Sequence, residues 1–234
     1  MTRQTLYLAS QSPRRREMMR WLGIPLQTTA PEIDEDPLPG ERPADLAARL
    51  ARGKAVAGAR VLADARGLAD ARGLADARAL DEAWVLAADT VVDLDGTSLA
   101  KPGDEAEARS MLLALRGREH LVHTGVALAS PGGEVAVRRV TTRVRMRAYS
   151  EAEIAAYIAT GDPMDKAGAY AIQHPGFHPV TEVETCYANV VGLPFGAVVR
   201  LLREAGWALD RDIPGLCGRH FGYRCEDPDE GEAV

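Results

Sequence analysis

The order of apolar runs and amphipathic segments narrows the fold of this chain more than any other feature of its sequence. Apolar runs of strand length alternate with segments of helical periodicity through most of the 234 residues. This alternation is typical of α/β proteins, in which helices cover the faces of a sheet. Pro131-Gly132-Gly133 lies between two long apolar runs and indicates a hairpin, which adds antiparallel strands. We therefore predict an α/β fold with a mixed, twisted sheet and flanking helices.

Capping and turn residues set the boundaries of the predicted elements. Ser12-Pro13 is typical of a helix start, and Ser150 with Glu153 forms a capping-box pattern. The predicted strands cover residues 5–9, 26–30, 83–94, 119–129, 134–147 and 169–172. The predicted helices cover residues 12–22, 104–116, 150–161 and 194–205, with a further helix that begins near Pro43.

A six-residue repeat interrupts this pattern between residues 63 and 80, where ADARGL, ADARGL and ADARAL follow one another. A period of six matches neither a helical face nor a strand. It does place Arg66 four residues before Asp70, a spacing that weakly supports a helix. We interpret the repeat as a surface insertion, helical or frayed, without a catalytic role.

The acidic balance of the chain comes from its last residues. The net charge is −6, but residues 226–234 hold five acidic groups, and the rest carries 29 acidic against 28 basic side chains. A body this close to neutrality lacks the basic face that nucleic-acid binding needs, although it allows a local cationic pocket for a small anion. No apolar run approaches the roughly 18 residues of a membrane span. We therefore expect neither a polymeric nucleic acid nor a membrane as a partner.

Cysteine usage bears on the location of the protein. Three cysteines, an odd number in a chain too large to depend on disulfides, indicate a reducing and hence cytoplasmic location. Cys217, Cys225 and His220 would need a fourth ligand and a better spacing to bind zinc, so we do not expect a zinc site.

Lysine is rare in this chain, which has 25 arginines and three lysines. Where any cation would serve, the chain uses arginine. Lys54, Lys101 and Lys166 are therefore candidates for sites that need a compact ammonium group rather than a planar guanidinium. The alternative is that three lysines survive by chance.

The first predicted strand leads directly into a helix whose start is rich in hydroxyl and guanidinium groups. Ser10, Ser12, Arg14 and Arg15 lie in this segment, SQSPRRRE. A helix N-terminus offers free N–H donors and a partial positive charge, and arginine binds phosphoryl oxygens in a bidentate manner. The segment predicts a phosphate site, with a capped helix bearing solvated arginines as the alternative.

Asp89, followed by Thr90, interrupts the apolar run at residues 83–94. A buried carboxylate is unfavourable unless a cation, a metal or a reacting water is its partner. Asp89 is thus a candidate general base or metal ligand, with a structural aspartate as the alternative. Further along, GDPMDKAGAYAIQ contains Lys166 and ends at Gln173, whose amide could hydrogen-bond the edge of a nucleobase.

Taken together, these segments resemble the Maf family of nucleoside triphosphate pyrophosphatases. The resembling stretches, in order along residues 5–207, are LYLASQSPRRREMMRWLG, ARLARGKA, LAADTVV, AKPGD, GDPMDKAGAYAIQ and NVVGLP. The resemblance implies a single two-lobed catalytic domain over residues 1–209, similar to the inosine triphosphatase fold, with a central cleft and the 63–80 repeat as an insertion. Residues 210–234 are then a C-terminal extension, which we expect to be partly disordered.

The resemblance also implies an activity and the residues that perform it. The family hydrolyses a nucleotide to a monophosphate and pyrophosphate with a divalent cation, Mg²⁺ or Mn²⁺. By motif position, Asp89 is expected to act as the proton acceptor that activates water. The residues expected to bind phosphate are Ser10, Arg14, Arg15, Lys54, Lys101 and Lys166, and those expected to hold the metal are Glu35 and Asp89.

Three positions separate the substrate classes of the family, and here they hold Arg14, Thr90 and Gln173. This combination looks like the dTTP/UTP type, because a neutral Gln amide can pair with the imide edge of a pyrimidine. The 7-methyl-GTP type tends toward Trp, Gln and Glu at these positions. Residues 174–178 and 185–187 depart from the glycines and the Gly-Ser-Tyr that are usual in the family, which affects base selectivity more than the reaction.

Two alternatives to a dTTP/UTP pyrophosphatase stay open at this point. One is a pyrophosphatase for 7-methyl-GTP or other modified nucleotides, and the other is a non-catalytic nucleotide-binding regulator of cell division. In each case we expect a small nucleotide as the ligand. A homodimer is possible on the sequence, which does not determine the oligomeric state.

Overall fold

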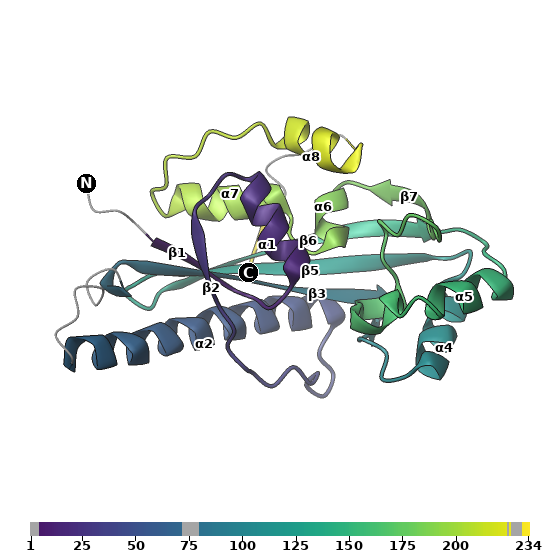
Figure 1. Ribbon diagram of the computed structural model, residues 1–234, viewed down its shortest axis with the longest axis horizontal. Coiled ribbons are helices and arrows are strands. Elements are labelled where there is room, and N and C mark those ends of the chain that lie inside the picture. The colour runs from purple at the N-terminus through teal and green to yellow at the C-terminus, as the bar shows by residue number, and fades with distance from the viewer. Residues whose placement is uncertain (1–4, 72–79, 224, 226–230) are drawn as a thin grey trace.

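A mixed sheet lies at the centre of the protein, with helices against both of its faces (Figure 1). The computed structural model describes residues 5–71, 80–223, 225 and 231–234. The strands in this part are β1 (Thr5–Ala9), β2 (Leu26–Thr29), β3 (Ala83–Leu94), β4 (Thr97–Leu99), β5 (Glu119–Ala129), β6 (Val135–Met146), β7 (Val180–Glu184) and β8 (Glu232–Ala233). The helices are α1 (Pro13–Trp21), α2 (Pro43–Ala71), α4 (Glu105–Leu115), α5 (Glu151–Ile158), α6 (Tyr187–Val191), α7 (Phe195–Glu204) and α8 (Ile213–Phe221), with the short 3₁₀ helices η1 (Asp162–Asp165) and η2 (Ala167–Ala169).

The strand order is β2-β1-β3-β5-β6-β7, with β4 paired to β3 and β8 paired to β6. β1 runs parallel to β2 and β3, whereas the pairs β3–β5, β5–β6 and β6–β7 are antiparallel. Both kinds of pairing occur in one sheet, so the predicted mixed α/β fold is confirmed. The hairpin predicted at residues 131–133 joins β5 to β6.

Successive side chains of β3 point to opposite faces of the sheet, so this one strand contributes to two hydrophobic cores. Val85 and Ala87 pack against α2 on one face of the sheet. Leu86 and Ala88 face the other way, toward a cluster that contains α1 and α7. Further along the strand, Val92 joins a separate cluster with α4 and α5. The residues of β3 before Asp89 and those after it are therefore both buried in hydrophobic clusters.

A glycine sets the spacing between α2 and the sheet. Gly125 of β5 lies opposite Asp89 of β3. A Cβ atom at Gly125 would lie 2.4 Å from the carbonyl oxygen of Ala47 and 2.8 Å from the Cα of Ala48, both on α2. Glycine thus allows a close approach of helix and strand that no other residue would permit. This contact fixes the height of α2 above the strand that carries Asp89.

The helix α2 continues into the hexapeptide repeat as far as Ala71. This agrees with the helical alternative for the start of the repeat, while residues 72–79 lie outside the described part of the chain. None of the described helices is both long enough and apolar enough to cross a membrane.

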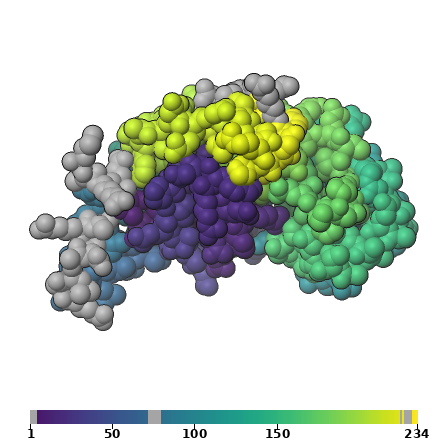
Figure 2. All heavy atoms as spheres, turned by 45° about the horizontal axis from the view of Figure 1, so that its top comes forward, coloured from purple at the N-terminus to yellow at the C-terminus, as the bar shows by residue number. Residues whose placement is uncertain are grey.

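The chain after residue 209 packs onto α1. Arg211 donates from Nε to the carbonyl oxygen of Leu22 at 2.6 Å, and the ring of His220 stacks on Trp21 with a centroid distance of 4.0 Å. Figure 2 shows the yellow C-terminal residues directly beside the purple residues of α1. The described part of the extension includes helix α8 and strand β8. Residues 224 and 226–230 lie outside the described part of the chain, and the expected partial disorder stays a prediction. The domain boundary at residue 209 stays a prediction.

The strand predicted at residues 169–172 is wrong. Residues 167–169 form η2, and the chain then enters a turn without pairing to the sheet. Gly168 and Ala169 have φ angles of 67° and 58°, in the left-handed region that a strand cannot contain. The apolar composition of this segment reflects burial against α4 and α5 rather than sheet formation.

Candidate active site

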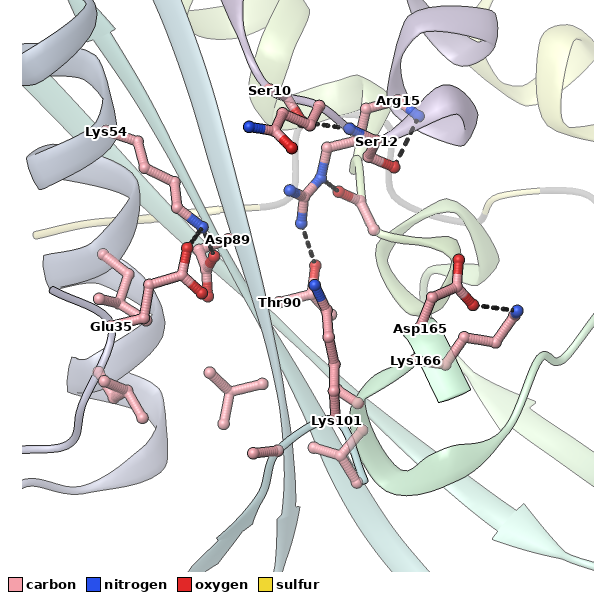
Figure 3. A pocket seen from close by; sticks show the side chains of 18 of the residues that line it. Ser10, Ser12, Arg15, Glu35, Lys54, Asp89, Thr90, Lys101, Asp165 and Lys166 are labelled. Atoms are coloured by element: carbon pink, nitrogen blue, oxygen red, sulfur yellow. Dashed lines mark hydrogen bonds and ion pairs between the residues drawn. The ribbon is translucent and has the colours of Figure 1, made fainter. Parts of the chain in front are cut away.

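A cavity of about 830 Å³ opens between α1, α2 and the residues around η1 (Figure 3). Its volume is in the range of small-molecule sites in proteins. The predicted site residues that line it are Ser10, Arg14, Arg15, Glu35, Lys54, Asp89, Thr90, Lys101 and Lys166. Predicted site residues that are far apart in the sequence therefore line the same cavity.

The start of α1 forms one wall of the cavity. Ser12 is the N-cap, its Oγ accepts from the backbone N–H of Arg15 at 3.4 Å, and Pro13 opens the helix. Ser10 Oγ accepts from the backbone N–H of Ser12 at 3.2 Å, which fixes the turn before the helix. The wall is thus an ordered helix N-terminus with hydroxyl groups, an arrangement that favours anions.

Arg15 is half-buried in this wall and already has protein partners. It donates from Nε to the carbonyl oxygen of Gly192 at 2.8 Å and from Nη2 to Thr90 Oγ1 at 3.0 Å. Burial lowers the pKa of Arg15 from its ordinary value, while the charge of Asp89 acts in the opposite direction. Two of its donors therefore hold the cavity wall together. Its assignment as a phosphate ligand stays a prediction.

Asp89, Lys54 and Glu35 form the opposite wall (Figure 3). Lys54 Nζ lies 2.5 Å from Asp89 Oδ1 and 2.7 Å from Glu35 Oε1. The residue Asp89 is 8% exposed, so its carboxylate is nearly buried but reaches the cavity. A compact ammonium between two carboxylates agrees with the rarity of lysine in the chain, because a guanidinium is wider and planar.

The same two carboxylates are the candidate metal ligands. Mg²⁺ prefers oxygen ligands and is commonly bound by one or two carboxylates together with substrate phosphates. Asp89 and Glu35 provide such oxygens, brought together by a shared cation. In the described part of the chain, no group of three His, Cys, Asp or Glu side chains could hold a metal by itself. The residues present thus fit a metal that phosphate oxygens help to bind.

Lys101 differs from the other cations of the cavity. It is exposed, and within the described residues no hydrogen bond or ion pair engages its ammonium group. Figure 3 shows its side chain extended into the cavity from the turn after β4. Lys101 is therefore available to a ligand in this structure.

Lys166 has three oxygen partners from its own segment. Its Nζ donates to the carbonyl oxygen of Asp162 at 2.5 Å, to Asp162 Oδ1 at 2.9 Å and to Asp165 Oδ1 at 2.6 Å. It lines the cavity, but its charge is already compensated. Phosphate binding by Lys166 stays a prediction.

Of the predicted specificity residues, Arg14 and Thr90 line the cavity. Gln173 is exposed and lies outside the lining in the described part of the chain. Gln173 belongs to the turn that stands in place of the expected strand, and its side chain does not line the cavity.

Asp165 and Tyr170 line the cavity but were not singled out in the sequence. Tyr170 donates to or accepts from His120 Nε2 at 2.8 Å. A signal for both was present, since they lie in the same segment as Lys166 and within four residues of it.

Comparison with known proteins identifies relatives over most of the chain. Residues 5–205 match the family described as Maf-like protein. A dTTP/UTP pyrophosphatase of Myxococcus xanthus is 47% identical over 205 residues, which cover 87% of this chain and 94% of that protein. A dTTP/UTP pyrophosphatase of Thermomicrobium roseum is 46% identical over 220 residues, 91% of each chain.

Among solved structures, a nucleoside-triphosphatase / dITP/XTP pyrophosphatase of Mycobacterium abscessus aligns with a TM-score of 0.39 and 16% identity. The alignment covers 86% of this chain and 94% of that one.

Proposed function

The chain belongs to the Maf family, and on this premise we propose that it hydrolyses dTTP and UTP to the monophosphate and pyrophosphate. The observation that carries the proposal is the convergence of Asp89, Arg14, Lys54 and Lys101 on one cavity. Phosphoryl transfer depends mostly on positioning and on charge stabilisation, and these residues provide both.

The reaction assigns separate roles to the two walls of the cavity. The N-terminus of α1, with Ser10, Ser12 and Arg14, binds phosphate oxygens through N–H, hydroxyl and guanidinium groups. Lys101 contributes a further ammonium from the turn after β4. Together they hold the triphosphate with its α-phosphorus toward the wall that carries Asp89.

Asp89 acts as the general base. A water molecule transfers a proton to its carboxylate as the water oxygen bonds to the α-phosphorus. The bond between the α-phosphorus and the bridging oxygen to the β-phosphorus breaks, and pyrophosphate leaves with the electron pair. Lys54 fixes the orientation of Asp89 through the 2.5 Å contact.

A divalent cation is part of the proposal. Glu35 and Asp89 are the residues that would hold it, and Mg²⁺ or Mn²⁺ would neutralise charge on the phosphate oxygens. The nearness of the two carboxylates supports this assignment.

Arg14 and Thr90 support a pyrimidine substrate because they match the dTTP/UTP type and lie at the cavity. Gln173 gives less support, since it is exposed outside the lining. The proposal therefore assigns base selection to residues of the cavity wall, with a contribution from Gln173 only if its turn rearranges. The free nucleotide is the expected ligand, and the cytoplasmic location and a homodimer stay predictions.

A substrate panel tests the proposed function. Pyrophosphate release is measured for dTTP, UTP, CTP, ATP, GTP and 7-methyl-GTP, each with Mg²⁺ and with Mn²⁺. We expect dTTP and UTP to give the highest kcat/KM. Preference for a purine or for 7-methyl-GTP would contradict the substrate assignment. Nucleotide binding without pyrophosphate release from any substrate would favour a non-catalytic regulator.

A further inference from the structure

The cavity lining holds carboxylates as well as cations, so it attracts a polyphosphate less strongly than the cations alone would. Among the described residues of the lining, five are cationic and five carry carboxylates. The cationic ones are Arg14, Arg15, Lys54, Lys101 and Lys166, and the carboxylates belong to Glu32, Glu35, Asp36, Asp89 and Asp165. Carboxylates therefore compete with phosphate for the same cations.

Asp165 differs from the other carboxylates in its position. Glu32, Glu35 and Asp36 lie in the loop before α2 and Asp89 in β3, on the side that would hold a metal. Asp165 ends η1 on the opposite side, beside Lys166 (Figure 3). No metal or general-base role in the proposed reaction requires a carboxylate there.

The two oxygens of Asp165 face two different cations. Oδ1 lies 2.6 Å from Lys166 Nζ, and Oδ2 lies 3.9 Å from Nη2 of Arg14. Arg14 belongs to α1, which packs in one core, whereas Asp165 follows α5, which packs in another, so their contact joins two separate parts of the cavity lining. A carboxylate that lies near two cations of the cavity lining can compete with a phosphate group for them.

The two contacts differ in how easily a ligand can replace them. Lys166 keeps two further oxygen contacts to Asp162, so its ammonium stays compensated when Asp165 moves away. Arg14 and Asp165 have side chains that are 36% and 71% exposed, and ion pairs of such exposure are weak. A phosphate group can therefore displace Asp165 from Arg14.

We propose that Asp165 tunes affinity by competing with phosphate groups for Arg14, which weakens the binding of polyphosphates and promotes product release. This inference rests on the proposed function for its catalytic consequence, but its binding consequence is independent of turnover. Weakening that applies equally to substrate and product raises KM, and it raises kcat where pyrophosphate release limits the rate.

The test replaces Asp165 with Asn, which keeps the size of the side chain and an oxygen for Lys166 but removes the charge. Binding of pyrophosphate and of tripolyphosphate is measured by calorimetry with the full chain. We expect Asp165→Asn to tighten both by about fivefold, because one weak ion pair and one like-charge repulsion disappear. A loss of structure would weaken binding, so tightening distinguishes competition from a structural role.

Two controls complete the experiment. Glu151→Gln removes one negative charge from the nearby helix α5, where Glu151 pairs with Arg109 and does not line the cavity, and should leave the binding of both anions unchanged. In an Arg14→Gln background, Asp165→Asn should no longer tighten binding, because the shared partner is gone. Unchanged or weaker pyrophosphate binding in Asp165→Asn, or equal tightening in Glu151→Gln, would overturn the inference. Absence of dTTP turnover in the parent protein would instead contradict the proposed function.

Discussion

Replacing Gly125 with alanine is expected to reduce both stability and catalysis, because the added methyl group has no room beneath α2. The new Cβ would lie 2.4 Å from the carbonyl oxygen of Ala47, where ordinary contacts are 3.4–4 Å. The helix must therefore withdraw from β5 by about 1 Å or the strand must bend. Overpacking of this kind costs about 1–3 kcal/mol of unfolding free energy.

The expected loss of catalysis follows because α2 carries Lys54, which contacts Asp89. Gly125 pairs with Asp89 across β3 and β5, and Lys54 of α2 reaches Asp89 over the same region. A withdrawal of α2 lengthens the 2.5 Å contact between Lys54 and Asp89. A misplacement of about 1 Å at a reacting group can reduce the rate by about 10²-fold.

Urea denaturation and steady-state pyrophosphate release measure the two effects separately. Activity is recorded at a temperature and urea concentration at which the variant is folded. Gly67→Ala is the matched control, since Gly67 lies on the same helix and a Cβ there meets nothing within 4 Å. This control should gain about 0.5–1 kcal/mol of stability and keep its activity. Activity within twofold of the parent in Gly125→Ala would refute the link between helix position and catalysis, and unchanged stability would refute the close packing.

Three further predictions concern other parts of the molecule. Lys54→Arg should lower kcat/KM by about 10²-fold despite the retained charge, because the wider guanidinium cannot occupy the space between Asp89 and Glu35; near-normal kinetics would show that any cation serves. Thr185 has a φ of 78°, and its hydroxyl makes long hydrogen bonds, 3.4 Å to Thr142 Oγ1 and 3.5 Å to the carbonyl oxygen of Thr141. Relief of the backbone strain should outweigh their loss, so Thr185→Gly should raise the unfolding free energy by about 1 kcal/mol in urea titrations, and a loss of stability would contradict this. Burial lowers the pKa of His120 from 6.5 to about 4, so the unfolded chain takes up a proton first as the pH falls. The unfolding free energy should therefore decline between pH 6.5 and 4 by up to about 3 kcal/mol, and His120→Gln should flatten that decline.

Local sequence signals predicted the elements that carry the site. Ser12-Pro13 predicted the start of α1, and Ser12 is indeed the N-cap with Pro13 in the first turn. The capping box of Ser150 and Glu153 is present at the start of α5. Such signals act within a few residues, so they do not depend on the rest of the fold.

The prediction that failed, a strand at residues 169–172, was overturned by the backbone conformation. The segment at residues 169–172 has the apolar composition of a strand, but the left-handed backbone at Gly168 and Ala169 turns it into a loop. That turn also leaves Gln173 outside the cavity. The partners of Lys166 were equally hidden, because no periodicity indicates that Asp162 and Asp165 fold back onto its ammonium group.

The packing of the first part of the C-terminal extension could not be predicted from the sequence either. Outside the acidic residues 226–234, Ile213, Leu216 and Cys217 bury their side chains in the cluster that contains α1. Whether such a segment docks depends on the apolar surface that the rest of the chain presents. The surface around Trp21 becomes apparent only once α1 is placed.

The central claim is that Asp89 removes a proton from water while other residues bind the triphosphate. Its most direct test compares Asp89→Asn with the parent protein, measuring the Kd of dTTP by calorimetry and kcat by pyrophosphate release. We expect the Kd to stay within severalfold of the parent value and kcat to fall by about 10²-fold or more. Near-normal turnover in Asp89→Asn would contradict the claim.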